Sequence, residues 1–420
     1  MGFGAVTFAA PGSAAPGNAA PRSTHITGQI IVKFGDDRAA AGVLRQHGLS
    51  EGAGIGSTRA QLIKVPAGKE LQLIEALNRN PAVEYAEPDE LVTATTTDEY
   101  FPRQYALENT GQTISNTAEK QVLDIGTPGA DVQAVNAWTV TKGPAPDPVT
   151  GSPSGIRVAI LDSGVTNDNG DITGKIVAQE NFTDGETGDD NYGHGTHVAG
   201  IVAAATDNGI GVAGVCPECR ILDAKVLNDS GSGSTSSISR GIDWAADNHA
   251  KVINMSLGQR VSSRTLEAAV NDAWSRNVVI VAAAGNGGTQ AKIYPGAYPN
   301  VIAVAATDNK DAKASFSTFG KWVDVAAPGV SVYSTFPNHP FVLGTQNGRS
   351  MGYDVASGTS MASPIVAGVA ALVWSTPAGT DNAAVRTKIE LTARKIAGTG
   401  TNWAHGRVNA HDAVKPPPLP

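Results

Sequence analysis

The segment IRVAILDSGV, residues 156–165, contains the strand that decides the fold and the first residue of chemical interest. Its apolar part, IRVAIL, lacks a regular alternation of apolar and polar residues, which is typical of a strand buried on both faces of a parallel sheet. Runs of the same character follow at 221–226, 252–255, 278–283 and 301–305. Segments with helical spacing separate the runs, at 194–205, 237–248 and 264–276. This alternation predicts a doubly wound α/β domain, in which chemistry gathers at the carboxyl ends of the strands.

The composition of the 420-residue chain is that of a globular protein with many tight turns, with 41% hydrophobic residues, 17% charged residues and 48 glycines. The formal net charge is −8 and no Lys/Arg-rich run occurs, so the chain is not expected to bind nucleic acid. No apolar stretch reaches the roughly 20 residues needed to cross a bilayer, and we therefore expect no membrane partner.

Residues 27–94 have a different pattern and are expected to form a unit of their own. Helical segments at 38–47 and 70–77 alternate with strand-like runs at 29–34, 61–65 and 83–92. This order indicates a small α/β sandwich of the split βαβ kind. The polar stretch TATTT that follows is typical of exposed linkers, where proteolysis concentrates. The unit is therefore either an ordinary N-terminal domain or a removable propeptide.

Two short segments flank these units. Residues 1–26 are rich in Ala, Gly and Pro, and they are either the remnant of a secretory signal, with Asn18-Ala19-Ala20 as its cleavage region, or a flexible leader. The main domain is expected to span residues 95–415. The Pro-rich tail, residues 416–420, is expected to be disordered.

The only two cysteines are Cys216 and Cys219. One C-x-x-C pair cannot complete a four-ligand zinc site, and no second pair or histidine cluster follows. We expect a small local disulfide in an exported protein. Two free thiols are the alternative, and nothing nearby resembles the context of a redox-active pair.

Two motifs place an acid and a base where the sheet is expected to end. Asp162 directly follows the apolar strand, although a turn is the commoner explanation for a single Asp near Gly. His194 lies between two glycines at the start of a helix. The helix dipole disfavours a charged imidazole there, so a carboxylate such as Asp162 is needed to stabilise it. His194 and His197 could instead bind a metal from one helical turn, but the Glu of H-E-x-x-H is absent, which argues against zinc.

Ser360 and Asn286 add the two other groups that acyl transfer needs. Ser360, in GTSMASP, precedes an apolar helical run at 365–374, where a serine is usually only a helix cap. Asn286, in VAAAGNGG, follows the strand at 278–283. A hydroxyl becomes a nucleophile when a base removes its proton, the base needs an orienting acid, and the oxyanion needs a donor. The combination predicts nucleophilic catalysis, although no single residue does.

Several motifs in this order resemble the subtilisin-like serine proteases (subtilases), and most closely the thermitase-like members. They are VAILDSGV, GHGTHVAGIVAA, VINMSLG, VAAAGN, YPNVIAVAATD and ASGTSMASP, within roughly residues 98–414. The resemblance implies a three-layer α/β/α domain with a mostly parallel sheet, preceded by a small ferredoxin-like α+β propeptide domain. It also implies the activity of a secreted, monomeric serine endopeptidase.

The resemblance assigns a role to each candidate residue. Ser360 would attack the scissile carbonyl, His194 would take and return the proton, and Asp162 would hold the imidazole. Asn286 and the backbone N–H of Ser360 would bind the oxyanion. Two chain edges would bind a peptide or protein substrate as an added β-strand, namely Ser256, Leu257 and Gly258 on one side and Gly231, Ser232 and Gly233 on the other. The uncharged surroundings of Asn286 favour apolar side chains before the cut.

The resemblance also implies a self-processing zymogen and structural calcium. The N-terminal unit would be an intramolecular inhibitor and chaperone, released by autocleavage between residues 91 and 98, with Ala94 before the cut. Calcium would be bound by oxygens of Asp98, Asp171, Ala205, Asn208, Ile210 and Val212. Carboxylate, amide and carbonyl oxygens in this number suit a hard cation.

Other interpretations remain open at this stage. A catalytically inactive subtilase fold that serves as a binding module should lack one of the four catalytic groups, and all four are present. A metal-dependent or esterase-type hydrolase is the other alternative. Inhibition by a serine-directed sulfonyl fluoride, with full activity retained after brief treatment with a chelator, would exclude the metal-dependent version. The insertion at 337–353 is longer than the family requires; we expect a surface loop, and the alternatives are a lid or a rim of the cleft.

Overall fold

The protein is described by a computed structural model that covers residues 25–90, 96–118, 120–144, 155–185 and 187–415. The chain divides into two compact units, Met1–Thr93 and Ala94–Pro420. The expected tail, most of the expected leader, and Ala94 with its neighbours at 91–95 lie outside the described residues.

The first unit is a four-stranded antiparallel sheet with strand order β2-β3-β1-β4. Its elements are β1 (His25–Phe34), α1 (Asp37–Gln46), β2 (Ala53–Gly54), β3 (Ala60–Lys64), α2 (Glu70–Asn78) and β4 (Val83–Glu90). Alternate residues of β1, namely Ile30, Val32 and Phe34, are fully buried in a cluster with side chains of both helices. The strand order and the two helices on one face are those of the ferredoxin-like fold that was expected.

The second unit is built on an eight-stranded, fully parallel sheet with strand order β16-β13-β12-β11-β10-β7-β9-β8. The strands are β7 (Arg157–Asp162), β8 (Ile176–Asn181), β9 (Arg220–Lys225), β10 (Val252–Met255), β11 (Val279–Ala283), β12 (Ile302–Thr307), β13 (Val325–Pro328) and β16 (Gly406–Arg407). All residues of β10, β11 and β12 are buried. This explains why their sequences are continuous apolar runs without alternation.

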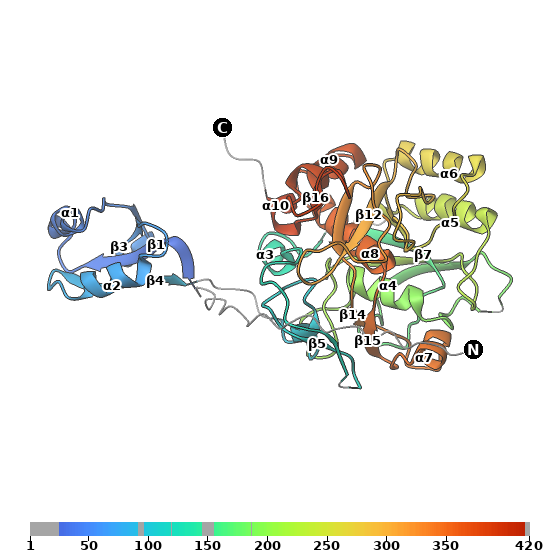
Figure 1. The fold of residues 1–420 in the computed structure, drawn as a ribbon, viewed down its shortest axis with the longest axis horizontal. Coiled ribbons are helices and arrows are strands. Elements are labelled where there is room, and N and C mark those ends of the chain that lie inside the picture. The colour runs from blue at the N-terminus through green and yellow to red at the C-terminus, as the bar shows by residue number, and fades with distance from the viewer. Residues whose placement is uncertain (1–24, 91–95, 119, 145–154, 186, 416–420) are drawn as a thin grey trace, which may run out of the picture. The chain divides into compact units, whose positions relative to one another are not determined.

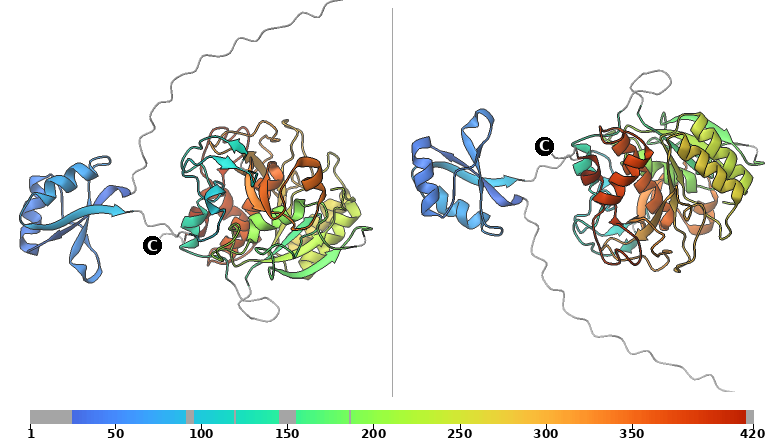
Figure 2. Two further views of the ribbon diagram at one scale, coloured as in Figure 1. Left: turned by 90° about the horizontal axis from the view of Figure 1, so that it is seen from below. Right: turned by 90° about the horizontal axis from the view of Figure 1, so that it is seen from above.

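Helices cover both faces of this sheet and complete a three-layer α/β/α arrangement. The helices of these layers are α3 (Ala134–Trp138), α4 (His194–Ala203), α5 (Thr235–Asp247), α6 (Arg264–Ser275), α8 (Thr359–Trp374), α9 (Asn382–Thr392) and α10 (Ala410–Val414). The short helix α7 (Val342–Asn347) has no buried residue and is not part of them. On β7, Val158 and Ile160 face the core beneath α4 and α8, whereas Ala159 and Leu161 face α5 and α6. Figures 1 and 2 show α5 and α6 (yellow) on one side of the sheet, away from the red C-terminal helices. The expected fold class is therefore confirmed.

Two small hairpins and two short helical turns complete the described part of the chain. The hairpins pair β5 (Ile114–Ser115) with β6 (Gln121–Leu123) and β14 (Val332–Thr335) with β15 (Tyr353–Ala356), and the 3₁₀ turns are η1 (Gly56–Thr58) and η2 (Phe101–Arg103). The segment between β14 and β15 contains the insertion expected as a loop. It carries the short helix α7, so the expectation of a plain loop was incomplete.

Cys216 and Cys219, between α4 and β9, form a disulfide, as expected. Both cysteines are fully buried in the larger hydrophobic core. No helix among the described residues is long and apolar enough to cross a membrane.

Candidate active site

The acid and the base expected from the sequence are in direct contact. Asp162 is the last residue of β7, and its Oδ1 lies 2.8 Å from Nδ1 of His194, the first residue of α4. Oδ1 also accepts the backbone N–H of Ser163 at 2.7 Å. The other oxygen, Oδ2, is buried and has no hydrogen-bond partner among the described residues. The nearly buried carboxylate therefore has the His194 ring as its main means of charge compensation.

Glycines allow the start of α4 to approach the end of β7. Gly193 has φ +96°, a conformation that disfavours side chains. A Cβ on Gly195 would lie 2.1 Å from the carbonyl oxygen of Gly164, so only glycine lets the two segments come this close. The G-H-G sequence is thus a geometric requirement of the Asp162–His194 contact.

A second buried carboxylate, Asp190, fixes the same junction. It accepts the backbone N–H groups of Gly193 and Thr196 and the hydroxyl of Ser163, each at 2.8 Å. The Ser163 hydroxyl in turn accepts the N–H of Gly195 at 3.0 Å. Asp190 therefore links the loop after β7 to the first turn of α4, although the sequence interpretation gave it no role.

The ionisation of His194 reflects competing influences. Burial lowers its pKa, but the negative charge of Asp162 and the hydrogen bond to it outweigh burial, with a smaller contribution from Asp190. The net effect is a pKa above the ordinary histidine value. His197, the other histidine of the motif, is fully buried against the ring of Phe336, and burial lowers its pKa to about 3. His197 is thus neutral and cannot share the proton chemistry of His194.

Ser360 is the second residue of α8, so its backbone N–H lies in the first helical turn, where no intrahelical acceptor exists. Its hydroxyl donates to the carbonyl of Ser256 at 3.2 Å, and among the described residues it makes no hydrogen bond to His194. The Ser256 hydroxyl donates to the carbonyl of Ser360 at 2.7 Å. The end of β10 thereby holds the start of α8, and the Ser360 hydroxyl has to give up its bond to Ser256 before it can donate to another group.

Asn286 follows β11 and is oriented by Thr359. Its Oδ1 accepts both the backbone N–H and the hydroxyl of Thr359, each at 2.9 Å. This leaves the Nδ2 group as a donor, on the side of Gly358 and Ser360: a Cβ on Gly358 would lie 3.3 Å from it. The same Cβ would lie 3.6 Å from the backbone N of Ser360, so the Asn286 amide and the Ser360 N–H are two donors on the same side of Gly358.

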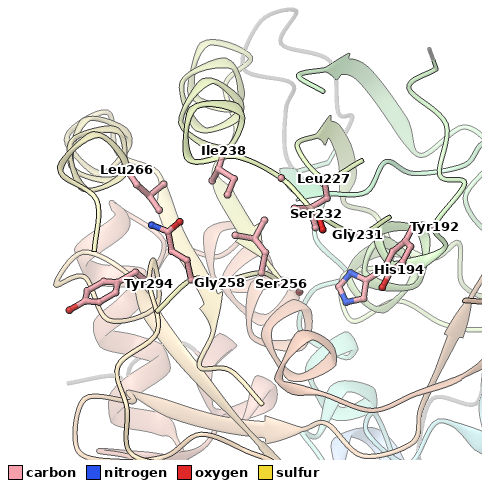
Figure 3. A pocket seen from close by; sticks show the side chains of 13 residues that line it. Tyr192, His194, Leu227, Gly231, Ser232, Ile238, Ser256, Gly258, Leu266 and Tyr294 are labelled. Carbon is pink, nitrogen blue, oxygen red and sulfur yellow. The ribbon is translucent and has the colours of Figure 1, made fainter. Parts of the chain in front are cut away.

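The two predicted substrate edges line one cleft of about 380 Å³. Figure 3 shows it with His194 and Tyr192 at one end and Tyr294 at the other. Its lining residues are Tyr192, His194, Leu227, Gly231, Ser232, Gly233, Ile238, Ser256, Leu257, Gly258, Gln259, Leu266 and Tyr294. Sequence reasoning identified the two edges and missed the apolar residues of α5 and α6, Ile238 and Leu266, because their spacing only signals helices that pack on the sheet.

Comparison with known families gives an independent result. The sequence profile of the subtilase family matches residues 153–408, and that of the fervidolysin N-terminal prodomain matches residues 12–89. The chain belongs to the subtilase family. As a subtilase it is a serine endopeptidase, and the N-terminal unit is a prodomain.

Individual relatives of this subtilase are similar along most of their length. Thermitase of Thermoactinomyces vulgaris is 47% identical over 285 residues, which cover 68% of this chain and 94% of the relative. A thermophilic serine proteinase of Bacillus sp. (strain AK1) is 40% identical over 94% of this chain and 88% of the relative. Among solved structures, a protease from Pseudoalteromonas arctica PAMC 21717 superposes with a TM-score of 0.64 at 29% identity, over 76% of this chain and 99% of that one.

The residues predicted to bind calcium also lie close together in the structure. Asp98 accepts the backbone N–H groups of Asp207 and Asn208, and the Asn208 side chain contacts Oδ1 of Asp171 at 2.8 Å. Oδ2 of Asp171 accepts the N–H of Val212 at 2.8 Å. The two other predicted ligands join the same cluster, since Ala205 N donates to the Asp171 carbonyl and Ile210 N to the Asn208 side chain.

The chemistry of this cluster fits a cation. Asp98 is 3% exposed and Asp171 0%, and among the described residues neither carboxylate has a Lys, Arg or His at ion-pair distance. Burial raises the pKa of Asp171, and the charge of Asp98 adds to this effect against hydrogen bonds from Asn208 and Val212. A Cβ on Gly211 would lie 2.0 Å from Oδ2 of Asp171, so the loop wraps closely around that oxygen. Among the described residues no cluster of three or more His, Cys, Asp or Glu exists, so amide and backbone oxygens would have to complete any such site.

Proposed function

We propose that this subtilase hydrolyses peptide bonds with Ser360 as nucleophile, His194 as general base and acid, and Asp162 as the residue that orients His194. The observation that carries the proposal is the 2.8 Å contact between Asp162 and His194 Nδ1. His194 lines the cleft together with Ser256, whose carbonyl accepts the Ser360 hydroxyl. With Nδ1–H directed at Asp162, the other ring nitrogen of His194 is left with a lone pair for a serine proton.

The reaction begins when the Ser360 hydroxyl leaves Ser256 and turns to His194. As Oγ bonds to the carbonyl carbon of the substrate, its proton passes to Nε2 of His194, and Asp162 stabilises the imidazolium that forms. The carbonyl oxygen becomes an oxyanion that accepts from Asn286 Nδ2 and the backbone N–H of Ser360. His194 then protonates the leaving amine, the C–N bond breaks, and water hydrolyses the acyl-enzyme by the same steps in reverse.

The substrate is proposed to be an extended peptide with apolar side chains before the cut. Leu227, Ile238, Leu257, Leu266 and Tyr294 line the cleft, and no Asp, Glu, Lys or Arg does among its described lining residues. Residues 231–233 and 256–258 offer backbone groups on opposite sides of the cleft, which suits a strand added between them. All four catalytic groups come from one chain, so we propose that the enzyme acts as a monomer.

We also propose that the protein is made as a self-processing zymogen and works outside the cell. The prodomain match and the Cys216–Cys219 disulfide support this, because disulfides persist in oxidising compartments. Calcium is proposed to bind Asp98, Asp171 and Asn208 together with backbone oxygens of Ala205, Ile210 and Val212. When bound there, it would neutralise two buried carboxylates and stabilise the fold.

The deciding experiment follows the mass of the chain during expression. Wild type should lose the residues before the segment 91–98, and Ser360→Ala should keep them attached. Ser375→Ala, at the far end of the same helix, is a matched control, because its hydroxyl contacts Thr141 and the Leu372 carbonyl and does not line the cleft. If Ser360→Ala is processed like wild type in purified form, the proposal of self-cleavage by Ser360 is wrong.

The oxyanion role of Asn286 can be tested separately. Asn286→Ala should lower kcat by about 100- to 1000-fold, the scale known from subtilisin, a member of the same family, with little change in KM. A variant with nearly wild-type kcat would show that Asn286 does not bind the oxyanion.

A further inference from the structure

The insertion at 337–353 is held at its base, its side and its top. At the base, the buried Asn169 donates to the carbonyls of Phe336 and Gly352, at 3.0 and 2.8 Å. At the side, Asp168 accepts the backbone N–H of Asn338 at 2.9 Å and pairs with Nδ1 of His339 at 2.7 Å. Because these hydrogen bonds anchor the insertion, it is a fixed part of the protein beside the cleft, which argues against a mobile lid.

The top of the insertion packs on the residues that precede His194. Phe341 is 3% exposed, and its ring occupies the place where a Cβ on Gly193 would lie, 2.3 Å from Cδ2. The first two N–H groups of α7, on Val342 and Leu343, donate to the carbonyls of Asn191 and Tyr192 at 2.9 and 3.1 Å. The insertion thus fixes the backbone on which Tyr192 is carried.

Tyr192 extends from this backbone across the end of the cleft. Its ring centroid is 6.5 Å from that of His194, and Figure 3 shows the two rings together. A Cβ on Gly231 would lie 2.6 Å from Cζ of Tyr192, so the ring reaches the opposite substrate edge. Tyr192, His194 and Leu227 therefore enclose one end of the cleft.

The place of Tyr192, His194 and Leu227 in the cleft determines which side chain of the substrate they would contact. The residue whose carbonyl Ser360 attacks must lie beside Ser256, because the Ser256 carbonyl is 3.2 Å from the Ser360 hydroxyl. Successive side chains of an extended chain point to opposite sides. The side chain of the preceding residue, called P2 here, therefore points toward Tyr192, His194 and Leu227.

We propose that the insertion is a buttress for Tyr192, and that Tyr192 restricts the P2 side chain of the substrate to small apolar residues. Tyr192 is then a specificity-determining residue and Phe341 a positioning residue that never touches the substrate. The inference rests on the proposed catalytic site and adds the substrate class that this site accepts.

The test uses a set of peptides that differ only at P2, with Ala, Leu or Phe, and compares kcat/KM for the mature enzyme. Wild type should prefer Ala to Phe. Tyr192→Ala should reduce the Ala-to-Phe ratio by roughly tenfold or more, the scale of discrimination by an apolar pocket. Phe341→Ala should change the ratio in the same direction by a smaller factor, although residue 341 does not line the cleft.

Two further variants make the result specific to the buttress. Val342→Pro removes only the N–H donated to Asn191, because proline is tolerated at the first position of a helix and Phe341 already has the extended conformation (φ −137°, ψ 160°) that precedes proline. It should lower the ratio on the order of threefold. Phe341→Leu, which keeps a bulky apolar side chain over Gly193, and Gln346→Ala, on the exposed side of α7, should leave the ratio unchanged.

The outcomes separate the inference from the proposed function. If Tyr192→Ala leaves the P2 ratio unchanged, or if Phe341→Ala lowers kcat/KM by the same factor for every peptide, the inference is overturned, because a purely structural role would act on all substrates alike. If Ser360→Ala retains wild-type activity on these peptides, the proposed catalytic site itself is wrong.

Discussion

Two buried aspartates nine residues apart, Asp162 and Asp171, compensate their negative charge in different ways. Asp162 is 1% exposed and has a partner within the chain, His194, at 2.8 Å. Asp171 is 0% exposed, lies in one cluster with Asp98, and has no such partner among the described residues. The fold itself places a partner that can become positively charged, His194, beside Asp162. The negative charge of Asp171 has to be compensated by a cation taken up from solution. One is therefore suited to catalysis and the other to cation binding.

The largest expected effect comes from removing the charge of the first carboxylate. Asp162→Asn should lower kcat by roughly 10⁴-fold, the scale found for subtilisin, because an amide cannot stabilise the imidazolium and favours the wrong tautomer of His194. Asp207→Asn is the matched control, since the Asp207 side chain pairs with Lys142 on the surface and does not line the cleft. A loss below tenfold in active-site-titrated enzyme would contradict the role given to Asp162.

Removal of calcium should affect stability and leave the chemistry of the folded enzyme intact. If the cation saturates its site about 1000-fold above Kd, its loss costs about 4 kcal/mol of unfolding free energy, and the thermal midpoint should fall on the order of 10 °C in a chelator. Differential scanning calorimetry with and without chelator checks this. An unchanged midpoint would mean that the Asp98–Asp171 cluster binds no cation that matters.

A substitution of Asp171 should lower the thermal midpoint more in calcium than in chelator. In calcium, Asp171→Asn removes a ligand charge. In chelator, the fall should be smaller, because relief of the repulsion from Asp98 offsets part of the cost of an amide NH2 that faces the N–H of Asn208 or Val212. Asp207→Asn should show no such difference. A midpoint lowered equally in both conditions would show that Asp171 is only a structural hydrogen-bond acceptor.

The smallest effect concerns pH. His194 acts as a base when neutral, and its pKa is raised, so kcat/KM should rise with pH through a midpoint above the ordinary value of about 6.5. In Asp162→Asn, burial remains while the attraction of the carboxylate is gone, so the midpoint of the residual activity should move to lower pH. A midpoint that stays in place after this substitution would assign the titration to another group.

The central strands, and the polar residues at their carboxyl ends that are proposed for catalysis, could be located from the sequence because their signals are local. The buried runs that became β7, β10 and β11 carry no polar alternation, and Asp162 is the last residue of β7 while Asn286 lies three residues after β11. The edge strands β8 and β16 escaped prediction for physical reasons: Val177 of β8 is 44% exposed, and β16 is only two residues long. Pairing with a neighbouring strand places β8 and β16 in the sheet, and the sequence of either segment alone does not reveal this pairing.

The wall of the cleft could not be predicted for a related reason. The residues that flank Tyr192 do not indicate that its ring reaches Gly231. Those that flank Phe341 do not indicate that its ring covers Gly193. Asp190 was likewise given no role from the sequence, although it accepts three hydrogen bonds at that junction. Contacts between distant loops arise from the packing of the whole domain, so they appear only in the structure.

The most direct measurement of the central claim is the site of labelling by a serine-directed sulfonyl fluoride. The account predicts one adduct per mature chain, on Ser360, formed as fast in Ser375→Ala as in wild type and at background rate in Asp162→Asn whose prodomain has been removed by wild-type enzyme. Peptide mass mapping that finds the adduct on another serine, or equally fast labelling without the Asp162 carboxylate, would contradict it.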